Sequence, residues 1–339
     1  LISYVQRHFK SMLPFLTASK ATNIIKALYE LYTKRIVCSS RPFVYRIDPC
    51  SLCNLKCVSC KTPYAKTREK RVMDLKDYVT IVGKIRKHAM RVSLYDMGEP
   101  LLHKEIYTMI KHTTENRISS LISTNFTLFN EADTKELIES GLTVLEPCLD
   151  GFTQKTYEQY RRGGDVETIK RGIRSVMQYK KLGGYRWPTM DVQVVLFKHV
   201  LDEISLIRAF LQENDVDKIT YRREILGFDG QNKKAAMKYS VRNKSCFWLY
   251  LGMMIRPDGN VYPCCGRDFD RFPYGNILEN SLDEIWNNEF YRISRQMFSK
   301  GPALDLSGEF LKIPCLTCEQ FKIVRSIVSI TDEDEEGCR

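Results

Sequence analysis

The sequence lacks the features of a membrane-spanning or secreted protein. No run of apolar residues approaches the roughly 18 that a transmembrane helix needs. The start of the chain shows no basic stretch, apolar stretch and cleavage site in succession, so no secretory signal is indicated. No recognised nucleic-acid-binding module occurs either, and no nucleic-acid partner is expected. These absences predict a cytoplasmic protein.

Cysteine, in contrast, is abundant, with 12 among the 339 residues. Without a secretory signal, this number indicates a reducing compartment and metal ligation rather than disulfides. The composition is otherwise that of a globular protein, 43% hydrophobic and 27% charged. The formal net charge is +11 although the chain ends in an acidic tail. The remaining residues are therefore more basic still, which favours an anionic substrate, an anionic surface or an acidic redox partner.

Strand-like and helix-like segments alternate from residue 43 onwards, with helical stretches over 74–88, 103–115 and 165–181. This alternation predicts an α/β fold in which six βα units form a parallel sheet curled into a partial (β/α)6 TIM-like barrel. Functional side chains are then expected at the C-terminal ends of the strands. The predicted strands cover residues 43–48, 91–96, 119–124, 143–150, 190–197 and 218–222.

The chain divides into four expected segments. An N-terminal helical segment (1–40) precedes the barrel core (41–224). The next segment (225–325) is richer in Cys, aromatic residues, Gly and Pro, and we expect it to form a second, smaller domain. The last segment is the acidic tail (326–339).

The N-terminal segment contains an amphipathic pattern. Ile24, Leu28, Leu31 and Tyr32 share one helix face, with lysines elsewhere around the helix. We expect this helix to pack on the barrel. The alternative is a peripheral contact with a membrane surface.

Three cysteines follow the first predicted strand with the spacing C-x3-C-x2-C: Cys53, Cys57 and Cys60. Three thiolates this close together can bind three irons of a 4Fe–4S cluster and leave the fourth iron open. A zinc site would pair Cys50 with Cys53 and Cys57 with Cys60, with only three residues between the pairs. Zinc ribbons usually separate such pairs by about a dozen residues. The spacing therefore favours an iron–sulfur cluster.

This loop resembles that of the radical S-adenosylmethionine (SAM) enzymes. The resemblance implies that the open iron binds the amino and carboxylate groups of SAM. It also implies that an electron, delivered by a donor such as flavodoxin or ferredoxin, cleaves SAM to a 5′-deoxyadenosyl radical. Cys50 stands where a Thr is expected in this family, so we predict that it is an extra thiol and not a ligand.

Three further motifs resemble this family, each after the next predicted strand. Gly98-Glu-Pro resembles the G-G-E-P motif that binds the amino group of SAM, with Met97 in place of the first Gly. Ser-Thr-Asn-Phe126 resembles S-T-N-G, and Cys148-Leu-Asp-Gly resembles S-L-D-G. An arginine after the fourth strand suits the SAM carboxylate, and a leucine in the fifth strand suits the adenine. The residues that these resemblances assign to cofactor binding are Gly98, Glu99, Ser123, Asn125, Asp150, Arg161 and Leu196.

A second cysteine group lies in the predicted small domain. Cys246 is followed after twelve residues by Gly259, four further residues lead to Cys264, and Cys315-x2-Cys318 comes later. This spacing resembles the SPASM extension of radical SAM enzymes, in a shortened, twitch-like form. The resemblance implies one auxiliary 4Fe–4S cluster with these four cysteines as ligands, although Cys264 and its neighbour Cys265 can exchange this role. Four thiolates also suit zinc, which remains the alternative.

The resemblance implies that the SAM-derived radical takes a hydrogen atom from a substrate. We predict oxidation (dehydrogenation) of a sugar, an aminocyclitol or another small molecule, with a base taking a proton and the auxiliary cluster taking an electron. The N-terminal segment is shorter than the leader-binding domain of peptide-modifying relatives, which favours a small molecule over a peptide.

Two other functions stay open. An epimerase or cross-linking enzyme, acting on a ribosomal peptide or a carbohydrate, would use Cys265 or Cys148 as hydrogen donor. A non-catalytic iron–sulfur redox protein would explain both cysteine groups but not the motifs around Glu99 and Ser123.

Overall fold

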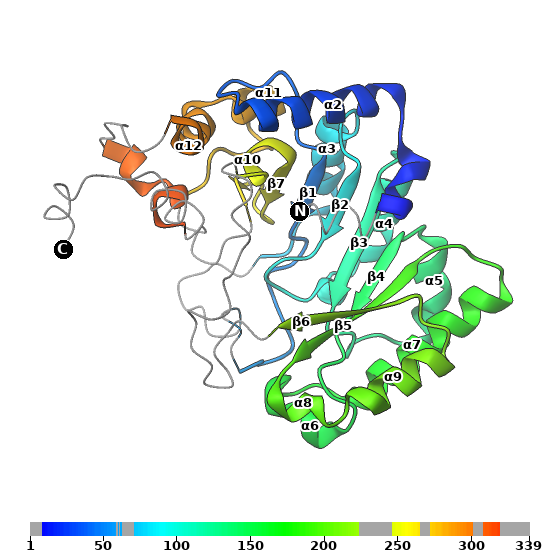
Figure 1. Cartoon of the computed structure of the whole chain (residues 1–339). Helices are drawn as coiled ribbons and strands as arrows, with labels where there is room; N and C mark the ends of the chain where they lie inside the picture. The colour runs from blue at the N-terminus through cyan, green and yellow to red at the C-terminus, as the bar shows by residue number, and fades with distance from the viewer. Residues whose placement is uncertain are drawn as a thin grey trace, which may run out of the picture.

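The computed structural model describes residues 9–58, 60, 62, 71–223, 246–264, 272–300 and 308–318. These residues form an eight-stranded sheet in the order β6-β5-β4-β3-β2-β1-β7-β8 (Figure 1). Strands β1 to β6 are parallel and each pairs with its neighbour in sequence, which confirms the predicted α/β fold. These strands are β1 (Val44–Ile47), β2 (Arg91–Leu94), β3 (Ser119–Thr124), β4 (Val144–Pro147), β5 (Thr189–Leu196) and β6 (Lys218–Arg223).

Helices connect the successive strands. Because neighbouring parallel strands are joined by right-handed crossovers, the connecting helices cover the same face of the sheet (Figure 1). Aspartates begin two of them: the Asp74 side chain accepts a hydrogen bond from Lys76 N, and Asp165 accepts from Glu167 N and Thr168 N. The connecting helices are α3 (Leu75–Ile85), α4 (Ile106–Glu115), α5 (Thr134–Glu139), α6 (Gln154–Tyr160), α7 (Val166–Leu182), α8 (Lys198–Leu201) and α9 (Ile204–Glu213).

The C-terminal part continues the barrel sheet. Strand β7 (Gly252–Ile255) pairs in parallel with β1, and β8 (Val261–Tyr262) returns antiparallel to β7. The turn between β7 and β8 contains Gly259, whose φ of 81° lies in the left-handed region. The segment expected as a separate small domain is therefore joined to the barrel by main-chain hydrogen bonds. Its helices are α10 (Trp248–Leu251), α11 (Leu282–Trp286) and α12 (Glu289–Lys300).

A buried arginine holds this part of the chain together. Arg295 of α12 is fully buried and donates hydrogen bonds to Leu249 O at 2.9 Å, Ile36 O at 3.1 Å and Trp286 O at 2.9 Å. Its guanidinium carbon also lies 4.5 Å from the centre of the Trp286 ring. One side chain thus joins the N-terminal segment, α10 and α11.

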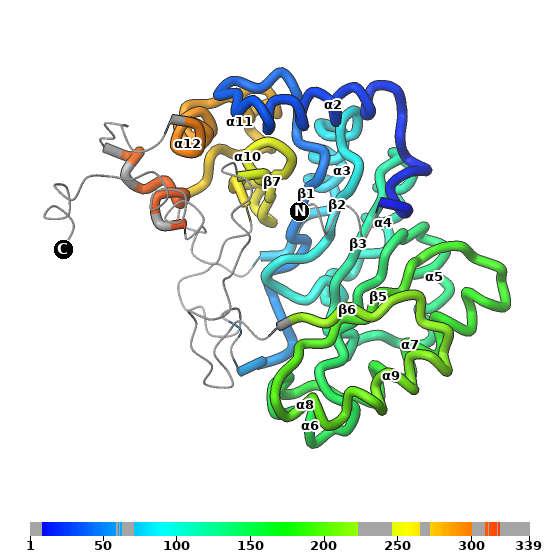
Figure 2. The backbone as a smooth tube through the Cα atoms, in the orientation of Figure 1, coloured from blue at the N-terminus to red at the C-terminus, as the bar shows by residue number. Residues whose placement is uncertain are grey.

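The N-terminal helix α2 (Ala18–Thr33) runs along the outer edge of the molecule and packs on α10 (Figure 2). Of the apolar residues expected to pack, Ile24 and Leu31 contact the core, but Leu28 and Tyr32 are 49% and 86% exposed. No helix among the described residues is both long and apolar enough to span a bilayer. The buried row of α2 is mostly polar: Lys20, Asn23, Ala27 and Glu30.

Candidate active site

The cysteine loop begins at the C-terminal end of β1, where the sequence predicted it. Cys53, Cys57 and Cys60 are free thiols, and Cys60 N donates to Cys57 O at 3.1 Å in a tight turn. Burial raises the pKa of Cys53 to about 11, and the charges of Cys57 and Cys60 raise it further. The three thiols therefore lie close together in a largely apolar setting, where bound iron would supply the positive charge that stabilises thiolates.

This donor set fits an iron–sulfur cluster. Each iron of such a cluster takes its own thiolate, so the sulfurs need not converge on one point. Among the residues that the structure describes, no three His, Cys, Asp or Glu side chains are arranged to hold a single metal ion.

Gly98 packs directly on the cysteine loop. A Cβ atom at this position would lie 1.9 Å from Cys50 O and 2.4 Å from Leu52 O. The next residue, Glu99, donates its backbone N–H to Leu52 O at 2.7 Å. A glycine is therefore required here because the two backbones touch, independently of any contact with SAM.

The Glu99 carboxylate joins the ends of β2 and β3. It is buried and accepts hydrogen bonds from Thr124 Oγ1 at 2.5 Å and Asn125 N at 2.8 Å. Burial raises the pKa of Glu99, while these hydrogen bonds lower it. Asn125 in turn donates from Nδ2 to Asn54 Oδ1 of the cysteine loop at 2.9 Å. Both side chains thus position the loop, and their contact with SAM stays a prediction.

Phe126, which stands where the family has glycine, keeps a glycine-like backbone. Its φ is 60°, an unusual value for a bulky residue. The side chain is fully buried and stacks on Phe129 with ring centres 4.3 Å apart. Gly172 of α7 makes room, because a Cβ there would lie 2.7 Å from the Phe126 ring. Packing thus compensates for the strained backbone.

Arg161 lies beside the cysteine loop, as expected for a residue near SAM. Its Nε donates to Asp150 Oδ2 at 2.7 Å, and it forms a hydrogen bond with the Cys57 sulfur. Burial opposes the charge of Arg161, but nearby Asp150 raises its pKa well above the ordinary value. The second Asp150 oxygen accepts from Val195 N at 2.6 Å. Asp150 therefore holds Arg161 in place.

The remaining predicted residues of this site lie at the same edge of the sheet. Ser123 is half-buried near the end of β3, and Leu196 is half-buried at the end of β5. Cys148 follows β4, and burial raises the pKa of its thiol to about 11, although the charge of Arg161 lowers it. Cys265 lies outside the described residues.

The second cysteine group also comes together. Burial raises the pKa of Cys246 to about 12, with further contributions from the charges of Cys315 and Cys318. Cys264 and Cys315 both interact electrostatically with Tyr291. The four free thiols thus gather beside α12, in buried or half-buried positions. This donor set fits a second iron–sulfur cluster.

Comparisons with known families agree with this geometry. Residues 47–207 match the sequence model of the Radical SAM superfamily. Residues 246–319 match the model of SPASM, an iron–sulfur cluster-binding domain. The chain belongs to the radical SAM superfamily and carries a C-terminal SPASM domain. It therefore uses SAM, a 4Fe–4S cluster that binds SAM, and an auxiliary cluster.

Relatives of this radical SAM protein act on different kinds of molecules. It is 23% identical, over 71% of its own length and 80% of the relative's, to a tungsten-containing aldehyde ferredoxin oxidoreductase cofactor-modifying protein of Pyrococcus furiosus. It is 24% identical to a probable GTP 3′,8-cyclase of Methanococcus maripaludis, over 50% of its own length and 57% of the relative's.

Solved structures show the same fold. Streptococcus suis SuiB bound to its precursor peptide SuiA superposes with a TM-score of 0.60, at 18% identity, over 79% of this chain and 69% of SuiB. The enzyme anSMEcpe with bound AdoMet superposes with a TM-score of 0.54, at 16% identity, over 84% of this chain and 98% of that one.

The structure adds an ionic cluster that the sequence analysis did not identify. Asp48 follows β1, Asp96 follows β2, and Arg256 follows β7, so three neighbouring strands bring them together. Arg256 Nη1 lies 3.3 Å from Asp48 Oδ2 and 2.5 Å from Asp96 Oδ2, and Arg46 Nη1 lies 3.3 Å from Asp96 Oδ1. The signal was present, because two strands of the radical SAM core end in Asp, but the third partner is 160 residues or more away.

Asp48 is the most perturbed member of this cluster. Its Oδ1 is buried and accepts no hydrogen bond from the described residues. Burial, followed by the charge of Asp96, raises the pKa of Asp48 to about 7, although Arg256 opposes this shift. A carboxylate with a pKa near neutrality is suited to accept a proton.

A second residue that sequence reasoning missed lies at the auxiliary site. The Tyr274 hydroxyl is 3.8 Å from Cys315 Sγ and 2.6 Å from Ser294 Oγ. Hydrogen bonds to cluster sulfurs change the reduction potential of a cluster. Tyr274 belongs to a Tyr-Gly-Asn-Ile stretch whose spacing alone does not indicate this contact.

Proposed function

We propose that this radical SAM protein oxidises a sugar, an aminocyclitol or another small molecule. When bound, the SAM-binding cluster and SAM supply a radical that removes a hydrogen atom from a substrate C–H bond. Conversion of H–C–O–H to C=O then requires the loss of one proton and one electron. The chain offers a carboxylate for the proton and an auxiliary cluster for the electron.

The observation that carries this proposal is the direct pairing of β7 with β1. The register joins Val44 to Gly252 and Ile47 to Ile255, so the two strands end side by side. One strand leads into the Cys53 loop, and the other belongs to the SPASM domain. This arrangement supports electron transfer from a substrate bound between the two clusters.

Asp48 is the proton acceptor that we propose. It lies at the end of β1, and its unpartnered Oδ1 leaves one lone pair available for a donor. The pKa of about 7 keeps a substantial fraction ionised at neutral pH. Arg256 and Asp96 position this carboxylate and balance its charge after it accepts the proton.

The relatives leave the substrate class open. The names of the two curated relatives refer to a cofactor and to GTP, which favours a small molecule. SuiB was solved with a precursor peptide, so a peptide substrate remains the alternative. We also propose a cytoplasmic location and an acidic electron donor such as flavodoxin or ferredoxin, because the formal net charge of +11 favours an acidic partner.

Epimerisation is the second candidate function, and Cys148 favours it. Its raised pKa keeps the thiol protonated at neutral pH, and a hydrogen-atom donor must carry its S–H hydrogen. Cys148 stands at the same strand edge as the SAM-binding motifs. Cys265 remains an alternative donor on sequence grounds alone.

Anaerobic reconstitution with iron and sulfide, followed by dithionite and SAM, tests the proposal. A radical SAM enzyme should release 5′-deoxyadenosine, whereas a non-catalytic redox protein should release none. Candidate alcohols deuterated at the reacting carbon should transfer deuterium to 5′-deoxyadenosine and give ketones. Return of an inverted alcohol carrying solvent hydrogen would instead identify an epimerase.

The variant Asp48→Asn separates the two stages of the reaction. It should release 5′-deoxyadenosine at close to the wild-type initial rate and form about 10²- to 10⁴-fold less ketone, the usual contribution of a general base. Full ketone formation by this variant would show that Asp48 is not the proton acceptor.

A further inference from the structure

The outward face of α2 is apolar, although most of the residues that anchor the helix are polar. Ile25, Leu28, Tyr29 and Tyr32 are 69%, 49%, 56% and 86% exposed. Their spacing of three and four residues places them on one face of the helix. We call these four side chains the outer face of α2. Leu13 and Leu16, just before the helix, are also exposed.

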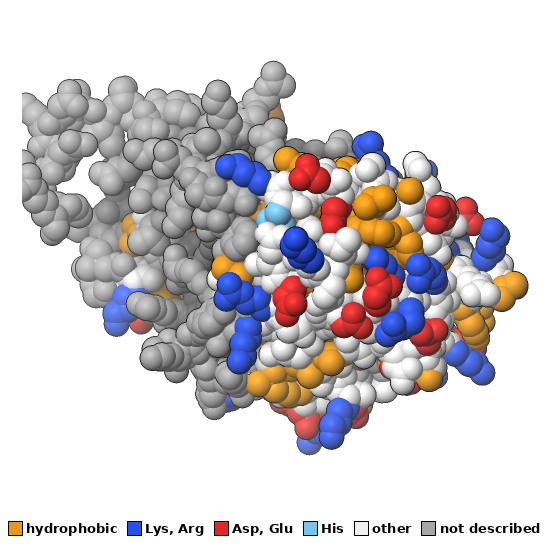
Figure 3. Space-filling view, turned by 90° about the horizontal axis from the view of Figure 1, so that it is seen from below, with side chains coloured by type: hydrophobic (Ala, Val, Ile, Leu, Met, Phe, Trp, Pro, Cys, Tyr) orange, Lys and Arg blue, Asp and Glu red, His pale blue; other side chains and the backbone are white. Residues whose placement is uncertain are grey.

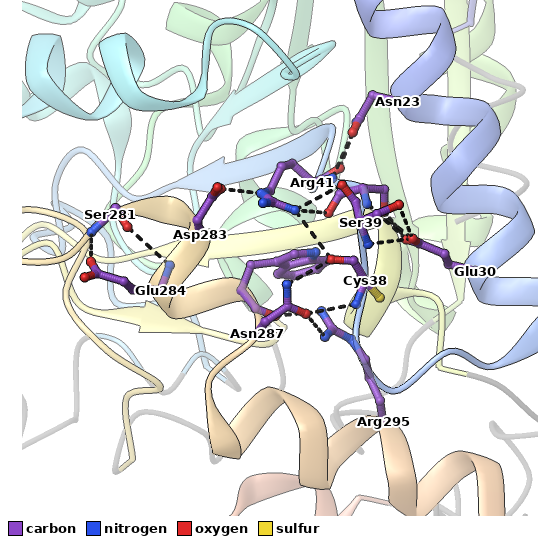
Figure 4. Close-up of polar contacts among 12 residues, drawn as sticks. Asn23, Glu30, Cys38, Ser39, Arg41, Ser281, Asp283, Glu284, Asn287 and Arg295 are labelled. Atoms are coloured by element: carbon purple, nitrogen blue, oxygen red, sulfur yellow. Dashed lines mark hydrogen bonds and ion pairs between the residues drawn. The ribbon is translucent and has the colours of Figure 1, made fainter.

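Polar contacts fix this orientation. The Glu30 carboxylate accepts hydrogen bonds from Ser39 N at 2.6 Å and Ser39 Oγ at 2.8 Å, and Asn23 exchanges two bonds of 2.8 Å with the Arg41 backbone. Figure 4 shows Asn23 and Glu30 reaching from α2 towards the segment that holds Ser39 and Arg41. Lys20 Nζ also donates to Arg117 O at 2.5 Å.

Rotating the helix to bury its outer face would break these bonds. Burial raises the pKa of Glu30, but the hydrogen bonds from Ser40 and Ser39 lower it more, so the carboxylate is ionised at neutral pH. Loss of its partners would leave a charge half-buried without compensation. The apolar outer face is therefore a stable feature of the fold.

The charges around this face have one sign. Glu30 is the only acidic residue between positions 9 and 41, and it points inward. Lys10, Lys26 and Arg35 are exposed, and Lys34 is half-buried. The face of the molecule seen from below differs, because acidic and basic side chains alternate there (Figure 3).

We propose that the outer face of α2 binds a lipid bilayer that contains anionic headgroups, with the helix lying parallel to the membrane plane. An apolar helix face enters the boundary between headgroups and acyl chains, and flanking cations bind anionic lipids. Tyrosines such as Tyr29 and Tyr32 are favoured at that depth.

A second copy of the chain fits this face less well. A two-fold interface would place the Lys and Arg side chains around one α2 against those of the other, and like charges repel. Anionic headgroups have the complementary charge. This inference goes beyond the proposed reaction and does not depend on it.

Vesicle flotation of the reconstituted protein tests the inference. The protein should float with phosphatidylcholine vesicles that contain about one-third phosphatidylglycerol, and bind pure phosphatidylcholine vesicles at least about tenfold more weakly. The double variant Ile25→Ser/Tyr32→Ser should reduce binding to the anionic vesicles by about tenfold or more. Lys26→Gln should weaken it about fivefold at low salt and less at high salt.

Leu182→Ser is the matched control. Leu182 is 80% exposed at the end of α7 and should tolerate the change without loss of vesicle binding. Equal binding by the double variant and the control, or no binding by the wild type, would overturn the proposal. A wild-type dimer that the double variant converts to a monomer, with no vesicle binding, would identify a second copy as the occupant and would also overturn it.

Discussion

Replacing Gly98 with alanine should stop SAM cleavage while leaving most of the fold intact. The added Cβ would lie 1.9 Å from Cys50 O and 2.4 Å from Leu52 O, whereas ordinary contact begins at 3.4 Å. The cysteine loop must therefore move by about 1.5 Å, the difference between 3.4 and 1.9. Both obstacles are backbone atoms, so no side-chain rotation can relieve the clash.

The size of the effect follows from this displacement. Leu52 immediately precedes Cys53, so the shift reaches a predicted ligand of the SAM-binding cluster. A misplacement of about 1 Å costs roughly 10²-fold in rate. Gly98→Ala should therefore lower the rate of 5′-deoxyadenosine release by about 10²-fold or lose iron altogether.

Gly83→Ala is the matched control. A Cβ at Gly83 meets no atom within 4 Å, and the residue lies inside helix α3. The change should raise the free energy of unfolding by about 0.5–1 kcal/mol and leave the rate unchanged. Iron content, chromatography of 5′-deoxyadenosine and thermal melting provide the comparison. A Gly98→Ala protein with full iron and the wild-type rate would refute the reasoning.

Three further predictions concern stability and metal content. Arg295→Lys should lower the free energy of unfolding by about 3–5 kcal/mol in a urea titration, because three buried carbonyls lose a shared donor. The raised pKa of Asp48 means that the folded protein keeps a proton that the unfolded chain releases, so stability falls as pH rises from 3.8 to about 7. Asp48→Asn should therefore melt at a higher temperature than wild type above this range and match it below; a constant difference would contradict this sign. Cys50→Ala should keep the iron content of the wild type, since Cys50 is predicted not to be a ligand.

The barrel could be predicted from the sequence because each strand is a short apolar run followed by a helix. The predicted strand at 119–124 coincides with β3, and the others differ from the observed strands by a few residues at most. Strand β7 was not predicted as part of the sheet, since Gly-Met-Met-Ile shows no alternation and its partner β1 lies about 200 residues earlier.

The orientation of α2 shows why periodicity alone can mislead. The apolar spacing correctly indicates a helix, but Asn23 and Glu30 have specific partners in the next segment, and these decide which side is buried. The candidate site shows the same limit. The motif residues Glu99 and Asn125 could be located by resemblance, whereas their hydrogen bonds to β3 and the cysteine loop depend on tertiary contacts.

Electron paramagnetic resonance of the dithionite-reduced protein, with and without SAM, tests the central claim most directly. The account predicts a signal from the SAM-binding cluster that changes when SAM is added. This response should disappear in Cys57→Ala and persist in Cys246→Ala, which affects only the auxiliary site. A reduced, iron-loaded protein whose spectrum does not respond to SAM, or anaerobically purified protein that contains only zinc, would contradict the account.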